Sequence, residues 1–245
     1  APVQIREQNI ELTGAGEQQA QFQVISVLPD QDVGDIFNHG LYEQTKTRIN
    51  DAATNNGYFD SYWRLHDVKV AQPQNTADVN LRFETGDRYK LGPVEFRMSD
   101  PLKPFPIDMD VLQSMVSWED GADYTFWRVN NLANNLTNSR YFNYTLVDAV
   151  KPDPIEKLSE NEASVQDKKQ VASAKEVTQS VVDETQFAGK TDAEGDQNLR
   201  QMRVEQETKQ SEEERLKAQA REEKKIPVIV TLNADRLNTA EVGAG

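Results

Sequence analysis

The chain has 245 residues, of which 37% are hydrophobic and 28% charged, and its formal net charge at pH 7 is −14. The acidic excess, with no basic patch in the sequence, argues against nucleic acid and anionic membrane surfaces as partners. Because there is no cysteine, disulfides, thiolate nucleophiles and cysteine-ligated metals are excluded. No apolar run approaches the roughly 20 residues needed to span a bilayer, and the start at Ala1-Pro2 indicates a processed or excised piece.

The first predicted element is a strand over residues 3–12, where apolar and polar residues alternate with one phase slip. Residues 18–28 fit a helix or a strand by periodicity alone. Residues 41–56 form an amphipathic helix that stops at Gly57, because glycine adopts the left-handed conformation at no steric cost. Two strands are then expected, the second with the cleanest alternation in the chain: residues 58–73 and 79–83.

The same order of elements recurs after Gly86. The second copy has an extended run, a helical stripe, a longer helix and a strand, at residues 89–98, 111–116, 129–136 and 141–150. The stripe at 111–116 occupies the place of residues 18–28, so it favours a helix there. The duplication predicts two copies of one small unit.

The last strand of the second copy is displaced along the chain. Residues 152–225 contain a single aromatic residue, Phe187, among Glu, Lys, Gln, Ser and Asp, which predicts a disordered or locally helical insertion. Its last part, residues 199–225, has strong helix formers and is expected to be a solvated, fraying helix without coiled-coil heptads. Residues 228–232 alternate again, and they are expected to pair with residues 144–150 as the missing hairpin partner.

Three short motifs accompany this order: Gly57-Tyr58-Phe59-Asp60-Ser61, the run from Gly86 to Val94, and the closing Asn238-Thr239-Ala240-Glu241-Val242-Gly243-Ala244-Gly245. With them, the chain resembles POTRA domains, the periplasmic part of outer-membrane barrel proteins of the BamA/TamA superfamily, and is most similar to the TamA branch. The resemblance implies an α+β fold of two tandem modules, each a three-stranded mixed sheet packed on two helices. The expected ranges are 1–87, then 88–151 with 226–237, with an insertion at 152–225 and the start of a barrel strand at 238–245.

Eight residues are expected to form the motif and core positions of the two modules. They are the glycines and aromatics at the ends of the second helices: Gly34, Gly57, Tyr58, Phe59, Gly121, Tyr124, Tyr141 and Phe142. The aromatic pairs could bind client peptides, but packing of helix on sheet is the favoured interpretation. The second copy has Arg140 where the first has Gly57.

The strand at residues 61–70 is the candidate binding site. As an unpaired sheet edge it would accept an extended client by strand addition, with Ser61, Trp63, Arg64, Leu65, Asp67 and Lys69 beside it. The charged members of this set could equally block edge pairing. Both interpretations stay open.

No catalytic, cofactor-binding or metal site is expected. The only histidines, His39 and His66, have no partner at ligand or triad spacing, and the aspartates at 30, 32 and 35 fit a solvated loop better than a calcium loop.

The resemblance implies a periplasmic binding module, attached to the outer membrane through its own C-terminal barrel. Its partners would be nascent outer-membrane proteins such as autotransporters and an inner-membrane TamB-type protein. Two alternatives are a BamA-like or two-partner-secretion transporter, and a passive spacer between barrel and inner-membrane partner. A periplasmic hydrolase is nearly excluded by the residues available.

Overall fold

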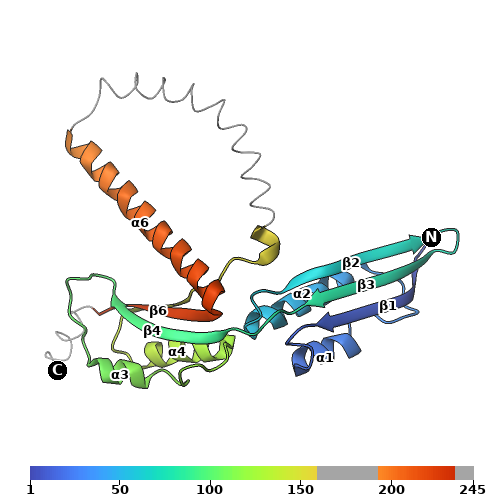
Figure 1. The fold of residues 1–245 in the computed structure, drawn as a ribbon, viewed down its shortest axis with the longest axis horizontal. Helices are drawn as coiled ribbons and strands as arrows, with labels where there is room; N and C mark the ends of the chain where they lie inside the picture. Colours follow the sequence, from blue (N-terminus) through green and yellow to red (C-terminus); the bar gives the residue numbers. More distant parts are fainter. Residues whose placement is uncertain (159–192, 235–245) are drawn as a thin grey trace, which may run out of the picture.

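The computed structural model describes residues 1–158 and 193–234, which form two α+β modules in tandem (Figure 1). The elements of the first module are β1 (Gln4–Thr13), α1 (Ala20–Val27), α2 (His39–Asn55), β2 (Tyr62–Ala71) and β3 (Thr76–Glu84). Those of the second are β4 (Lys90–Met98), α3 (Met109–Ser114), α4 (Phe126–Asn138), β5 (Tyr144–Ala149), α6 (Ala193–Glu223) and β6 (Lys225–Asn233). The expected barrel strand at 238–245 and residues 159–192 of the insertion lie outside the described residues.

Both modules contain the same three-stranded mixed sheet. The strand orders are β1-β3-β2 and β4-β6-β5, and in each sheet the central strand runs parallel to the first and antiparallel to the other. The α+β fold class predicted from the sequence is confirmed. The predicted pairing across the insertion is confirmed as well, since β5 and β6 are in register from Tyr144 opposite Asn233 to Ala149 opposite Val228.

The duplication extends to individual main-chain hydrogen bonds between the first strand of each module and the loop before its second helix. In the first module Ile5 N donates to Asp35 O (2.8 Å) and Phe37 N to Val3 O (2.7 Å); in the second, Leu91 N donates to Ala122 O (2.8 Å) and Tyr124 N to Tyr89 O (3.0 Å). Gly34 and Gly121 begin these loops with φ of +98° and +78°, which explains a glycine at both positions.

The insertion leaves the entry to the central strand unchanged. Asn75 precedes β3 with φ of 53°, and Lys224 precedes β6 with φ of 54°. Their carbonyl oxygens accept equivalent 3.0 Å hydrogen bonds, from Gln4 N and Lys90 N respectively. The long insertion therefore replaces only the tip of a hairpin, where added chain length costs little.

The cores lie between each sheet and its two helices. In the first, Phe22 of α1 and Ile49 of α2 are fully buried with Phe83 of β3. In the second, the central strand supplies every other residue to the core: Ile226, Val228, Val230 and Leu232. Residues 18–28 contain the helix α1, so the helical alternative for this range is confirmed. Its residues Phe22 and Ile25 are buried in the first core.

The helix α6 meets the second sheet on the face opposite α3 and α4 (Figure 1). The outward faces of the two central strands differ in polarity. The outward residues of β3 are Asp78, Asn80 and Arg82, whereas those of β6 are Pro227, Ile229 and Thr231, so the second sheet offers α6 the more apolar face. Covering apolar surface with a helix is favourable, and covering a polar ladder is not.

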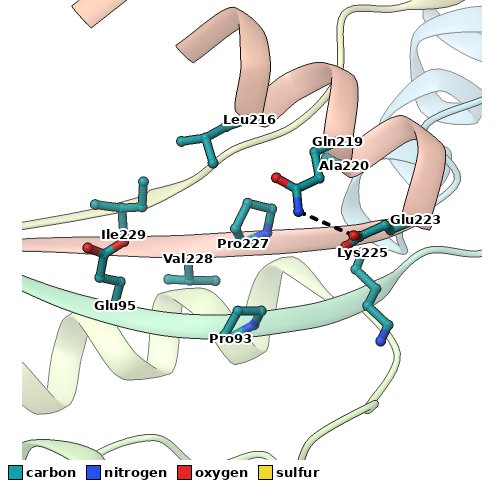
Figure 2. A pocket seen from close by; sticks show the side chains of 10 residues that line it. All are labelled: Pro93, Glu95, Leu216, Gln219, Ala220, Glu223, Lys225, Pro227, Val228 and Ile229. Carbon is teal, nitrogen blue, oxygen red and sulfur yellow. Dashed lines mark hydrogen bonds between the residues drawn. The ribbon is translucent and has the colours of Figure 1, made fainter. Parts of the chain in front are cut away.

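The last turns of α6 and this apolar face line a partly open pocket of about 220 Å³ (Figure 2). Leu216 and Ala220 face Pro93, Pro227 and Ile229 across it. Ala220 is only 2% exposed, so the prediction of a solvated helix is wrong for these turns. It holds toward the start of the described side chains, where Leu199, Met202 and Val204 are exposed.

Candidate functional site

The predicted binding strand lies at a sheet edge. Within the described residues β2 pairs with β3 on one side and with no strand on the other. Ser61 directly precedes β2. The side chains of Leu65, Asp67 and Lys69 lie on the outer face of the sheet, each next to an outward polar residue of β3. Asp67 accepts a 3.2 Å hydrogen bond from Asn80 Nδ2, so this face is polar.

Trp63 points the other way, toward the core. Its ring packs edge-on against Phe83 with centroids 4.8 Å apart, and its Nε1 donates to Asn50 Oδ1 at 3.2 Å. The Lys46 ammonium lies 5.9 Å from the same ring. Trp63 therefore anchors β2 on α2 and the sheet.

A β-bulge follows at Arg64, which has no partner in the register between Trp63 and Leu65. Bulges disturb edge pairing locally. The Arg64 guanidinium pairs with Glu84 at 3.1 Å, and the Trp63 main-chain N–H donates to Glu156 Oε1 at 2.7 Å. The beginning of the edge is thus occupied, and the part beyond the bulge is open.

The first Tyr-Phe motif forms the joint between the modules. Tyr58 packs edge-on against Phe22 in the first core, whereas Phe59 packs between Tyr89 and Tyr124 of the second, with centroids 5.3 and 4.9 Å away. Two neighbouring side chains thus enter two different cores. Both side chains are buried, and through them the motif connects the two cores.

Gly57 allows this close approach. Its φ is +87°, and a Cβ at this position would lie 3.0 Å from Tyr124 Cβ and 3.1 Å from Tyr89 O. The Gly57 carbonyl also accepts a 2.8 Å hydrogen bond from Tyr89 N. A side chain here would be crowded against Tyr89 and Tyr124 of the second module.

Polar contacts complete the joint. The Tyr89 hydroxyl donates to Asp60 Oδ1 at 2.6 Å, and burial together with this carboxylate raises the pKa of Tyr89 above its ordinary value. Arg88 reaches both modules: its Nε donates to Asn56 O at 2.8 Å and its Nη1 lies 3.5 Å from Asp123 Oδ2. These contacts add polar attachments between the modules to the packing of Phe59.

The second Tyr-Phe motif differs from the first. Phe142 packs partly against its own core, but Tyr141 is 51% exposed, so the expectation that Tyr141 is a core residue is wrong. Arg140 has φ of 62° in place of Gly57, and in the described structure no further module receives the ring. The motif buries both aromatics only where a neighbour packs on it.

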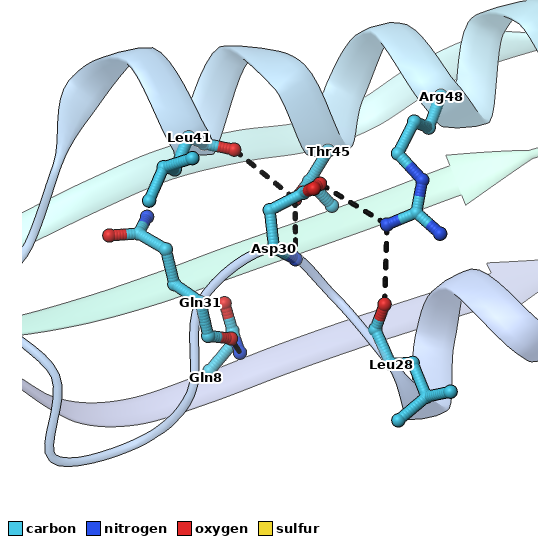
Figure 3. Close-up of polar contacts among 7 residues, drawn as sticks. All are labelled: Gln8, Leu28, Asp30, Gln31, Leu41, Thr45 and Arg48. Carbon is cyan, nitrogen blue, oxygen red and sulfur yellow. Dashed lines mark hydrogen bonds and ion pairs between the residues drawn. The ribbon is translucent and has the colours of Figure 1, made fainter.

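The loop that contains Asp30, Asp32 and Asp35 is attached to α2 by hydrogen bonds (Figure 3). Asp30 Oδ2 accepts hydrogen bonds from Thr45 Oγ1 at 2.6 Å and Arg48 Nη1 at 3.2 Å, and Gln31 beside it is 4% exposed. Asp35 Oδ2 accepts from the Asp32 main chain at 2.9 Å. The prediction of a solvated loop is therefore wrong for Asp30, whose carboxylate ties the loop to α2.

Across residues 1–158 and 193–234, no three His, Asp or Glu side chains are grouped as ligands for a metal ion. In the same part of the chain, no helix has the length and hydropathy required to cross a bilayer.

Sequence reasoning missed four residues that meet at the joint: Asp60, Asp153, Glu156 and Arg221. Asp60 belongs to a motif, but its partners are distant in sequence. Arg221 is 161 residues away, and single-sequence patterns carry no signal for such pairs.

No family model matches the sequence. The chain is similar in fold to POTRA domains 3–5 of BamA from Haemophilus influenzae, at 10% identity and a TM-score of 0.43, covering 94% of this chain and 61% of that one. BamA from Haemophilus ducreyi lacking POTRA domains 1–3 is 12% identical at a TM-score of 0.45, and the match covers 95% of this chain and 29% of that one. POTRA domains 1–3 of Omp85 from Anabaena are 9% identical at a TM-score of 0.40, and the match covers 98% of this chain and 69% of that one. The chain thus spans about three fifths of the first of these structures and less than a third of the second.

Proposed function

We propose that the chain is the periplasmic part of an outer-membrane assembly factor, in which two POTRA modules bind segments of client or partner proteins. The observation that supports this best is the edge of β2, which is open beyond the bulge in the described structure. Main-chain groups on such an edge bind an extended polypeptide largely irrespective of its sequence. This property suits a binding module that receives clients of varied sequence, and it requires no catalysis.

The side chains around the edge set its selectivity. Leu65, Asp67 and Lys69 would lie beside a bound segment on the outer face, with Arg64 and Ser61 at its beginning. Trp63 would contribute by holding the strand in place. The charges of Arg64, Asp67 and Lys69 would oppose like-charged segments and prevent promiscuous edge pairing.

Proline substitution at two neighbouring positions tests strand addition. In an antiparallel pair, successive residues alternate between N–H groups that point toward the partner strand and outward. Of Lys69→Pro and Val70→Pro, one variant therefore loses a bond to β3 and is destabilised, while the other loses only an outward donor. Each serves as the control for the other.

The readout is binding of a fluorescent ten-residue strand peptide from an outer-membrane barrel protein, with thermal melting measured in parallel. The variant that keeps its melting temperature should bind the peptide at least about tenfold more weakly, equivalent to roughly 1.4 kcal/mol. Unchanged peptide binding by that variant would rule out the β2 edge.

Within this class, we propose membership of the TamA branch, with an inner-membrane TamB-type partner and autotransporters among the clients. The motifs from Gly86 to Val94 and from Asn238 to Gly245 support it. Co-purification of a TamB-type protein with the full-length protein, weakened when the two modules are removed, is the expected result. Absence of a TamB-type protein from the purified complex would favour the BamA-like alternative.

A passive spacer is the second candidate, and the joint favours it. Phe59, Gly57 and Asp60 join the two modules through close contacts, as a spacer requires. Replacing both modules with an unrelated rigid linker of equal length would preserve assembly if spacing alone mattered.

A further inference from the structure

Both ends of the insertion return to the joint between the modules. The leading end is residues 151–158, which follow β5, and the trailing end is the last turns of α6, which precede β6. Neither end is required to complete a sheet, because β5 and β6 already pair along their length. Their contacts with the first module therefore call for a separate explanation.

Arg221 of α6 joins three parts of the chain. Its Nε lies 3.4 Å from Asp60 Oδ1 in the first module, and its Nη2 donates to the main-chain oxygen of Asp153 in the leading end. Asp60 also accepts the hydroxyl of Tyr89 from the second module. The Arg221 and Asp60 side chains are 28% and 20% exposed, so solvent screens this pair only partly.

Three further contacts continue the same arrangement. Lys217, one turn earlier on α6, pairs with Asp153 Oδ1 at 3.3 Å. Glu156 of the leading end accepts the Trp63 N–H of β2 at 2.7 Å. Lys224, directly after α6, pairs with Asp87 in the connection between the modules.

We propose that the two ends of the insertion form a clasp, made of Asp153, Glu156, Lys217 and Arg221, that fixes the orientation of the first module relative to the second. Modules in tandem move relative to one another unless their interface is extensive. The joint supplies a pivot, since its contacts with the second module come from the short run of residues 56–60. The clasp adds attachments at Asp60 and Trp63, the latter outside that run, so it resists rotation about the pivot.

The absence of cysteine makes a direct test practical, because spin labels can be placed at two chosen sites only. Suitable exposed positions are Asp51 on α2 and Asn134 on α4. Pulsed electron–electron double resonance then measures the distribution of distances between the modules. The test variant combines Arg221→Gln with Glu156→Ala and removes both attachments to the first module.

The matched control is Arg97→Gln. Arg97 pairs with Glu212 of α6 at 2.9 Å, and this pair ties the helix to its own module without touching the first. The clasp variant should broaden the distance distribution about twofold while Arg97→Gln leaves the width unchanged. Equal widths in the clasp variant and the unsubstituted chain would overturn the proposal.

A second variant covers the case in which α6 loses its helix when the clasp is broken. Residues 153–224 are replaced by the four residues that close the first hairpin, Gln72 to Asn75, since Asn75 and Lys224 have the same conformation before the central strand and the register of β5 with β6 places residue 152 opposite Lys225. This chain should show the same broadening. A narrow distribution here would show that Phe59 and its neighbours alone fix the orientation, and would overturn the clasp.

Discussion

Substitution of Phe59 by alanine should destabilise the second module, although Phe59 lies within the sequence of the first. Phe59 precedes β2 of the first module, yet its ring is 7% exposed inside the second core against Tyr89 and Tyr124. The expected consequence is a loss of stability in the strands β4 and β6.

The magnitude follows from the burial and the ring geometry. Burying an aromatic ring of this kind is worth about 2–3 kcal/mol, and leaving a cavity raises the cost of Phe→Ala to about 3–5 kcal/mol. Two edge-to-face contacts at 5.3 and 4.9 Å place Phe59 in the upper half of that range. The control is Tyr141→Ala in the second Tyr-Phe motif, where the ring is 51% exposed and about 0.5 kcal/mol is expected.

Urea unfolding gives the total loss of stability, and hydrogen–deuterium exchange assigns it to strands. In Phe59→Ala, amides of β4 and β6 should exchange faster, with a smaller change in β1 and β3. Faster exchange confined to the first module, or a loss no greater than that of Tyr141→Ala, would refute the assignment of Phe59 to the second core.

Two further predictions concern the same joint. Gly57→Ala should lower the free energy of unfolding by about 2–4 kcal/mol, because left-handed strain of about 1–2 kcal/mol adds to crowding of the new Cβ at 3.0 Å from Tyr124 Cβ. The control Gly121→Ala has φ of +78° but open space, so it should lose only the strain energy. Equal losses for the two variants in urea unfolding would contradict the crowding argument. The second prediction concerns alkaline pH. The folded-state pKa of Tyr89 is raised by burial and by Asp60, so the full contribution of Tyr89 to stability is present below its unfolded pKa of about 10 and is lost as pH rises above it. The free energy of unfolding should therefore fall as pH rises above about 10, less steeply in Tyr89→Phe, and identical slopes for the two chains would count against the buried hydroxyl.

Alternation and duplication were sufficient to predict the elements, their order and the two-fold repeat, and the resemblance implied the sheet that they form. Val79, Leu81 and Phe83 alternate with polar residues, and so do the residues of β6, because each strand has one face in a core. The repeat resolved the ambiguity at α1 and identified β6 as the partner of β5 across the insertion. Such local periodicities depend on neighbours in the chain, so a single sequence contains them.

The candidate site was only partly predictable. The sequence placed a strand at residues 61–70, and the edge position followed from the expected topology. It gave no indication that Trp63 faces the core while Leu65 faces outward, because the intervening bulge at Arg64 shifts the alternation by one residue. A one-residue shift exchanges the two faces of a strand.

The sequence by itself determined the elements, their order and their repetition, since these depend on hydrophobic period and on glycines at left-handed turns. Only the tertiary structure decided that Tyr58 and Phe59 enter different cores, that Tyr141 is exposed, and that Arg221 meets Asp60. Each of these depends on which surface is brought against which, and a neighbour 161 residues away leaves no periodic trace in the chain.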